Sequence, residues 1–274
     1  MRDIIMFIIL TCTSLFAMAG SVDHHHPKFA NPDVRSNDNF VTIRAGSFQM
    51  GSPVSEANRD SDESLHEVTI TKDFSIQTTV VTQAQYFLAI GCNPSHFQKR
   101  SYCGNDYVEI NGASLCPNNP VEQVSWEDAQ DFIAKLNLAD SDYSYRLPTE
   151  AEWEFSARGG TQTAYWYGND ANRLGDYVWF NGSQTHAVGS KPANQYGLYD
   201  AQGNVGQWVQ DLYVKDLGSS HQTDPVGATT GSLRVVRRSF WYDPAYNVRA
   251  ASRHYGVPWE RFYAYGFRLV RTAK

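Results

Sequence analysis

The stretch Tyr145-Arg146-Leu147-Pro148-Thr149-Glu150-Ala151-Glu152-Trp153-Glu154 decides the fold of this 274-residue chain. Thr149 can cap a helix with its hydroxyl, and the carboxylate of Glu152, three residues later, can reach back to the cap. Gly159 and Gly160 then end the helix, because glycine readily adopts the left-handed backbone that follows a last turn. We therefore predict a short helix between Thr149 and Gly159, anchored by Arg146 through carboxylates and carbonyls.

Two more helices are predicted from capping residues that precede apolar residues at helical spacing. One runs over 81–91, and the other begins at Ser125, with Asp128 as its capping partner, and ends near Asn137. Alternating apolar residues predict strands around 41–43, 48–50, 68–70 and 74–76, with briefer ones at 233–236 and 266–270. Gly, Asn, Asp and aromatic residues dominate the rest of 161–274, so little further regular structure is expected there.

The composition suits a loop-rich domain with a core of aromatic rings. The chain has 7 Trp, 16 Tyr and 14 Phe, and its net charge is −6. That negative charge argues against nucleic acid or an anionic membrane as a partner.

The first 19 residues are typical of an export signal. Arg2 is followed by an apolar run over 4–10, and Ala17-Met18-Ala19 resembles a cleavage site. The run is too short to span a bilayer, so no transmembrane segment is predicted and the protein is expected to be secreted or periplasmic. A lipoprotein anchored at Cys12 is the less favoured alternative. We predict a signal peptide over 1–19, a flexible leader with three adjacent histidines over 20–39, and one domain over 40–274.

Three cysteines remain after the predicted cleavage: Cys92, Cys103 and Cys116. An oxidising compartment favours pairing of an even subset of them. Cys103 and Cys116 flank the hairpin signal Asn111-Gly112, which favours a disulfide between them and leaves Cys92 free. Closing so short a loop stabilises a protein by roughly 3 kcal/mol.

Four segments carry a resemblance to a known family. They are Gly46-x-Phe48-x-Met50-Gly51 with His66-Glu67-Val68; Asn119-Pro120-Val121-x-x-Val124-Ser125-Trp126-x-Asp128-Ala129; the opening stretch with Ala157-Arg158-Gly159-Gly160; and Tyr196-Gly197-Leu198-Tyr199-Asp200-x-x-Gly203-Asn204-Val205 with Gly266-Phe267-Arg268. In this order they resemble the formylglycine-generating enzyme family, also called the sulfatase-modifying-factor fold. The resemblance implies a single α+β domain of low regular secondary structure, similar in topology to C-type lectins.

The same resemblance shows what the chain lacks. Founding members of the family hold copper with two cysteines and oxidise a substrate cysteine to formylglycine. The resemblance places Tyr242 and a position near Asn247 where those cysteines would stand, and neither position supplies a thiolate ligand for Cu(I). The chain is thus expected to be a divergent member that neither binds copper nor generates formylglycine. The family serine matches at Ser239, and the resemblance implies a vestigial pocket of Ser239, Trp241, Tyr242, Asn247 and Arg253.

The resemblance also implies a calcium site. Its ligands would be the side chain of Asp200, the carbonyls of Gly203 and Val205, and the side chain of Gln207, all of which supply the oxygen that calcium prefers. Gln207 replaces the usual Glu, which weakens the site. A second family calcium site would fall near Asp176 and Tyr177, where its downstream carboxylate has no match.

Two functions remain open. The first is a binding or regulatory module of the cell envelope, whose partner is an envelope protein, a peptide or a glycan. Its cleft would be lined by Trp241, Tyr242, Tyr246, Arg249, Arg253, Trp259 and Tyr263. The alternative is a divergent metal-dependent oxidase that uses copper or non-haem iron on a peptide or small molecule. The histidines show no metal-ligand spacing, and whether iron binds is left open.

Overall fold

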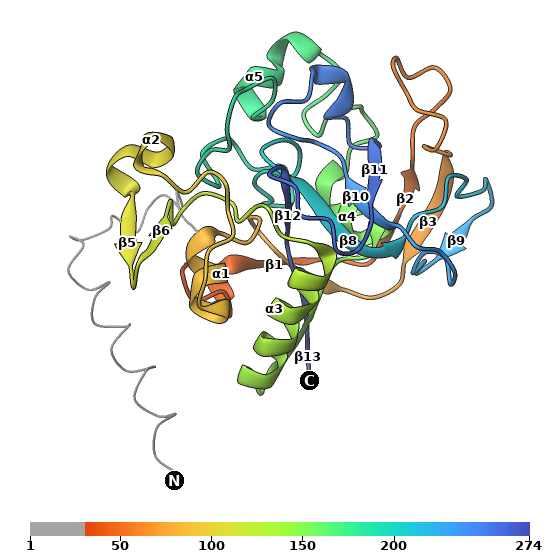
Figure 1. Cartoon of the computed structure of the whole chain (residues 1–274). Helices are drawn as coiled ribbons and strands as arrows, with labels where there is room; N and C mark the ends of the chain where they lie inside the picture. Colours follow the sequence, from red (N-terminus) through yellow and green to blue (C-terminus); the bar gives the residue numbers. More distant parts are fainter. Residues whose placement is uncertain (1–30) are drawn as a thin grey trace.

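The computed structural model describes residues 31–274, so the predicted signal peptide, Cys12 and the leader histidines lie outside the described residues. Loops and turns join short helices and strands into the α+β fold that the resemblance implies (Figure 1). None of the helices within 31–274 is both long and apolar enough to cross a membrane.

The first sheet brings the two ends of the domain together. Its order is β1 (Phe40–Ile43), β4 (Phe74–Gln77), β13 (Val270–Ala273) and β7 (Tyr143–Arg146), with antiparallel neighbours throughout. The last strand of the chain therefore lies between β4 and β7, more than 120 residues earlier in the sequence.

The second sheet carries the C-terminal half. Its order is β11 (Arg253–Gly256), β10 (Arg234–Arg237), β8 (Gly206–Leu212) and β12 (Tyr265–Phe267), with β12 parallel to β8. The run predicted as one strand over 266–270 is thus wrong: β12 and β13 belong to different sheets, and buried Arg268 lies between them.

Two smaller sheets complete the strands. β2 (Gly46–Met50), β3 (His66–Ile70) and β9 (Gln222–Thr223) form one of them. The other is the hairpin of β5 (Val108–Ile110) and β6 (Ala113–Leu115). Asn111 and Gly112 both have positive φ at its turn, as the Asn-Gly signal predicts.

Three helices begin with capping boxes, two of them at the predicted residues Ser125 and Thr149 and the third at Thr82, where no box was predicted. They are α1 (Gln83–Ile90), α3 (Trp126–Ala139) and α4 (Glu150–Arg158), capped by Thr82, Ser125 and Thr149. Arg146 pairs with Glu152 at the start of α4, with its Nη2 2.6 Å from the carboxylate, which confirms its anchoring role. The helices α2 (Arg100–Cys103) and α5 (Leu174–Tyr177) are one turn each, as are the 3₁₀ segments Asn37–Asn39, Gly104–Asp106, Ala171–Arg173 and Ala245–Asn247.

The domain begins before residue 40. Asn39 is buried and its side chain accepts a hydrogen bond from the Asn31 amide at 2.9 Å, while Arg271 donates to the carbonyl of Arg35 at 3.0 Å. Val34 joins the apolar core that faces α3. The flexible leader predicted over 20–39 therefore does not extend through 31–39, because an apolar side chain and backbone hydrogen bonds tie this segment down.

Candidate functional site

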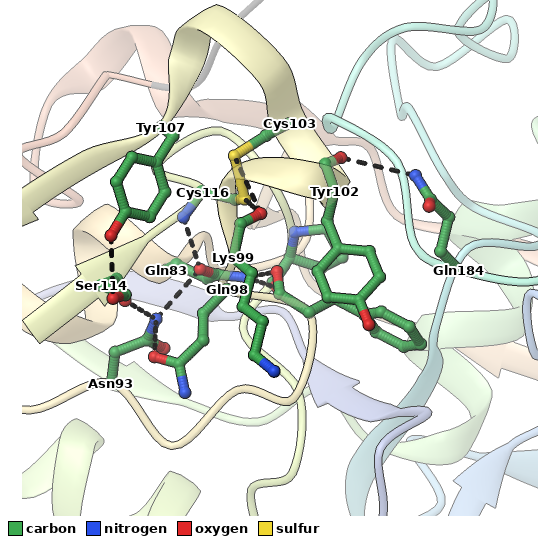
Figure 2. The surroundings of a disulfide bond; sticks show 12 residues. Gln83, Asn93, Gln98, Lys99, Tyr102, Cys103, Tyr107, Ser114, Cys116 and Gln184 are labelled. Atoms are coloured by element: carbon green, nitrogen blue, oxygen red, sulfur yellow. Dashed lines mark hydrogen bonds between the residues drawn. A yellow bond between two sulfur atoms is a disulfide. The ribbon is translucent and has the colours of Figure 1, made fainter.

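The predicted disulfide is present between Cys103 and Cys116, and Cys92 is free and exposed. Figure 2 shows the bond joining the end of α2 to the segment after β6. Close by, the Cys116 amide donates to Gln83 Oε1 at 2.9 Å, and Gln184 reaches the Tyr102 carbonyl at 3.4 Å. The disulfide therefore fixes helix α2, which carries Tyr102, against the body of the domain.

Five rings gather at and beside α2, and we call them the aromatic face: His96, Tyr102, Trp241, Tyr242 and Tyr263. Their neighbouring ring centroids lie between 4.9 and 6.3 Å apart. Buried Phe97 supports them from beneath, with centroids 5.0 Å from Tyr102 and 5.4 Å from Trp241, both edge to face. The face thus joins residues from distant parts of the chain.

Members of the aromatic face differ in exposure. Trp241 is 8% exposed and Tyr263 is 38% exposed. Tyr242 is half-buried between Trp241 and Phe262, and burial raises the pKa of its phenol to about 12, with the nearby Asp243 carboxylate as the second cause. At neutral pH Tyr242 is therefore a neutral phenol.

The other residues of the predicted pocket serve the backbone nearby. Ser239 Oγ accepts a hydrogen bond from the Gly203 amide at 2.7 Å and is buried. Asn247 donates to Asp243 Oδ1 at 3.1 Å, and Asp243 Oδ2 accepts from the Phe240 amide at 3.0 Å. These contacts hold the turn that presents Trp241 and Tyr242.

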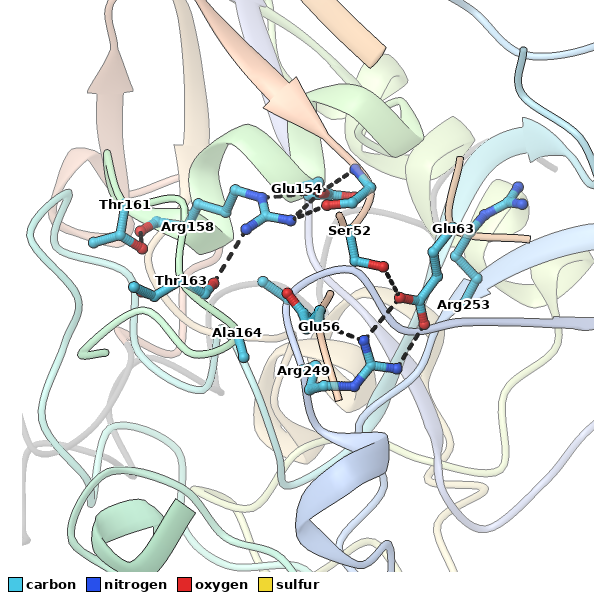
Figure 3. A network of polar contacts seen from close by, with 12 residues as sticks. Ser52, Glu56, Glu63, Glu154, Arg158, Thr161, Thr163, Ala164, Arg249 and Arg253 are labelled. Atoms are coloured by element: carbon cyan, nitrogen blue, oxygen red, sulfur yellow. Dashed lines mark hydrogen bonds and ion pairs between the residues drawn. The ribbon is translucent and has the colours of Figure 1, made fainter. Parts of the chain in front are cut away.

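Arg253 and Arg249 do not belong to the aromatic face. Arg253 pairs with both oxygens of buried Glu150, at 2.6 and 2.9 Å, and also donates to the carbonyls of Asp62 and Val214. Arg249 makes two 2.7 Å bonds to Glu63 and one to Glu56 (Figure 3). The prediction that Arg249 and Arg253 line the cleft is therefore wrong, because both guanidinium groups are buried in ion pairs with buried carboxylates.

This network is charge-balanced by further pairs. Burial acts to raise the pKa of Glu150, but Arg253 and Arg237 hold it below its usual range. Arg237 also bridges Glu150 to Glu154, which in turn pairs with Arg158. The helix α4 of the opening sequence is thus tied to the C-terminal segment by ion pairs, which gives the network a structural role.

The remaining residues of the predicted cleft are scattered. Tyr246 is 50% exposed and, with Arg249, lines a depression of about 480 Å³ near Glu56 and Tyr165. Trp259 is 65% exposed, and among the described residues it makes no ring contact with the aromatic face. Among the described residues, five of the depressions measure about 390 to 610 Å³, and Trp241, Tyr242 and Tyr263 line none of these five.

The predicted calcium ligands do not fit a calcium ion in this arrangement. Gln207 Oε1 already accepts from Trp153 Nε1 at 2.8 Å and from Arg268 Nε at 2.7 Å. Gln207 Nε2 donates to the Asp200 carbonyl at 3.0 Å, which also accepts from Arg268. The Arg268 guanidinium and the Trp153 indole therefore already use the Gln207 oxygen that a cation would need, and Asp200 Oδ2 accepts from the Gly189 amide at 2.8 Å.

Other metal positions were also predicted or left open. Asp176, of the second predicted calcium site, is exposed and lies 3.7 Å from Arg173. Throughout residues 31–274, no group of three or more His, Cys, Asp or Glu side chains is placed to hold a metal ion.

Fold and site together define a C-type-lectin-like α+β domain with an aromatic surface built from both halves of the chain. The chain belongs to the family of the sulfatase-modifying factor enzyme 1-like domain, whose model matches residues 26–273. This match confirms the family that the four sequence segments indicate.

Several relatives have curated names, and two of them show the range. The chain is 30% identical to the formylglycine-generating enzyme of Thermomonospora curvata over 241 residues, which cover 79% of this chain and 74% of that enzyme. It is 31% identical over 251 residues to the serine/threonine-protein kinase pkn1 of Chlamydia caviae, covering 86% of this chain. That match takes in 38% of the kinase, so the chain spans about two fifths of the length of this relative.

Two solved structures are similar over most of both chains. Treponema denticola variable protein 1 has a TM-score of 0.71 at 29% identity, covering 84% of this chain and 94% of that one. PvdO from Pseudomonas aeruginosa has a TM-score of 0.72 at 28% identity, covering 85% and 93%. These neighbours confirm the predicted fold.

Proposed function

We propose that this chain is a binding module whose ligand, a peptide or a glycan, docks on the aromatic face. The observation that carries the proposal is the contiguity of five rings over one buried support, Phe97. Tyr and Trp offer a large, rigid contact area at low cost in conformational entropy, which is why they dominate many binding surfaces.

The chemistry at Tyr242 favours binding over oxidation. Copper chemistry of the family type needs two thiolates, and the resemblance puts Tyr242 and a position near Asn247 in their place. Tyr242 is a protonated phenol at neutral pH, as an ordinary tyrosine is, and burial raises its pKa further to about 12, which makes an anionic metal ligand still less accessible. The side chain therefore offers a hydrogen bond and a ring face. The Asn247 amide is held by Asp243.

The proposal includes an extracytoplasmic location, secreted or periplasmic, with an envelope protein among the candidate partners. The disulfide between Cys103 and Cys116 supports it, since such bonds persist in oxidising compartments. Without this bond, helix α2, which carries Tyr102, would lose a covalent tie to the domain.

The test is a binding screen of the full chain against immobilised peptides and glycans, with copper, iron and oxygen uptake measured on the same preparation. We expect a ligand whose binding falls at least tenfold in Tyr263→Ala. Tyr255→Ala is the matched control, since Tyr255 is 44% exposed and packs on Tyr213 instead. One equivalent of copper or iron together with oxygen consumption on thiol peptides would favour the oxidase and overturn the proposal.

A further inference from the structure

The aromatic face depends on one loop, residues 93–98, which carries His96 and Phe97. Two polar side chains from outside the loop, Gln83 and Glu122, form hydrogen bonds with its backbone. Gln83, the first residue of α1, donates to the Phe97 carbonyl at 3.0 Å and accepts from Asn93 at 3.0 Å. Asn93 also donates to the Ser114 carbonyl at 2.9 Å. These contacts hold the two ends of the loop.

The middle of the loop is held by Glu122. This residue is completely buried, and its Oε1 accepts a hydrogen bond from the Phe97 amide at 2.8 Å. The Glu122 amide donates to Ser95 Oγ at 3.2 Å. The second carboxylate oxygen, Oε2, is buried and has no hydrogen-bond partner among the described residues. A buried carboxylate that is half satisfied is costly when ionised.

No cation compensates this carboxylate. Burial raises the pKa of Glu122 to about 7, and the amides of Phe97 and His96 offset that rise in part, while no charged side chain of the described residues contributes. The titratable groups on or around the loop are His96, Cys92 and Lys99 along the chain, Tyr102 and Tyr263 against its rings, and Asp128, Asp131, Lys135 and Arg261 across the adjoining depression.

We propose that Glu122 is the positioning residue of the aromatic face, and that its protonation state latches loop 93–98 in place. Protonated Glu122 keeps the loop closed, because Oε1 still accepts from the Phe97 amide and no charge is buried. Ionised Glu122 favours opening, because the open loop lets water reach the carboxylate.

The direction follows from proton linkage. Water access returns the Glu122 carboxyl to an ordinary pKa, so the closed loop binds its proton more tightly than the open loop does. Raising the pH therefore shifts the loop toward the open form, and the effect levels off above about pH 7, where Glu122 is ionised in both forms. The closed form of loop 93–98, which supports the aromatic face, is thus most populated at mildly acidic pH. The link to ligand binding rests on the proposed function, but the latch itself does not.

The experiment is amide hydrogen exchange of the full chain between pH 5.5 and 8, expressed as protection factors so that intrinsic exchange rates cancel. We expect the protection of the Phe97 amide to fall at least tenfold over this range. In Glu122→Gln, whose Oε1 can still accept from Phe97, protection should not change with pH. In Glu122→Ala, protection should be low throughout.

The control is Asp211→Asn. Asp211 is a second buried carboxyl whose pKa is raised to about 7, and it accepts from the Glu150 amide, away from the loop. This variant should leave the loop's pH dependence unchanged. A flat profile in the native chain, or the native profile in Glu122→Gln, overturns the latch. These readouts need no ligand, so failure of the binding screen and failure of the latch are separate results.

Discussion

The ring of Phe97 meets the indole of Trp241 edge to face, with centroids 5.4 Å apart. The contact joins loop 93–98 to the C-terminal turn that carries Trp241 and Tyr242, so Phe97 supports the aromatic face from both sides. Replacing Phe97 with Ala should lower the free energy of unfolding by about 3 to 5 kcal/mol, since a fully packed ring is lost. Urea denaturation measures this loss. Phe97→Leu should cost clearly less, and equal losses for both variants would contradict the importance of the ring.

The Arg268–Gln207 contact predicts how the protein responds to calcium. Because Gln207 Oε1 already accepts from Arg268 and Trp153, millimolar calcium or a chelator should not shift the melting temperature. Gln207→Leu should destabilise the fold by about 2 to 3 kcal/mol, because two buried donors lose their acceptor. Differential scanning calorimetry tests both statements. A rise of several degrees with calcium would restore the four predicted ligands, Asp200, Gly203, Val205 and Gln207, as a site.

Arg253 is predicted to act on stability and not on ligand contact. Arg253→Leu removes one of two arginines from buried Glu150 and should cost about 3 to 5 kcal/mol of unfolding free energy. Replacing exposed Arg44, which pairs with Asp73 at the surface, should cost well under 1 kcal/mol and serves as the control. An Arg253 variant with native stability but lost binding would instead place this residue in the site.

Two buried carboxyls predict the pH dependence of global stability. Burial raises the pKa of Glu122 and of Asp211 to about 7, and repulsion from Glu150 adds to the rise for Asp211. The folded state therefore binds more protons than the unfolded state, so stability is highest at mildly acidic pH and falls as pH rises toward 7. Each group contributes on the order of 3 kcal/mol. Urea midpoints from pH 5 to 8 should fall in the native chain and less so in Asp211→Asn, whereas a rising profile would contradict this account.

The sequence predicts the features that depend on interactions between residues close together in the chain. The capping boxes at Ser125 and Thr149, the Asn-Gly hairpin and the disulfide are of this kind, and all are present. The strand β8 gave no signal, because it is buried on both faces from Gly206 to Val209 and shows no alternation of apolar and polar residues.

The site was predicted in part. Trp241, Tyr242 and Tyr263 do lie together, but His96 and Tyr102 join them from another region, which no spacing in the sequence reveals. Arg249 and Arg253 were placed at the surface because charged residues are usually exposed, whereas their carboxylate partners stand nearly 200 and about 100 residues away. Only the folded chain shows those pairs.

The most direct measurement of the central claim is the affinity of Tyr263→Ala and Tyr255→Ala for a peptide or glycan identified in the screen. Both substitutions remove a partly exposed tyrosine ring, but Tyr263 belongs to the aromatic face and Tyr255 does not. A binding module that uses this face predicts a loss of at least tenfold in Tyr263→Ala, or about 1.4 kcal/mol, and near-native affinity in Tyr255→Ala. Equal affinities for the two variants, with both folded, would contradict the proposal.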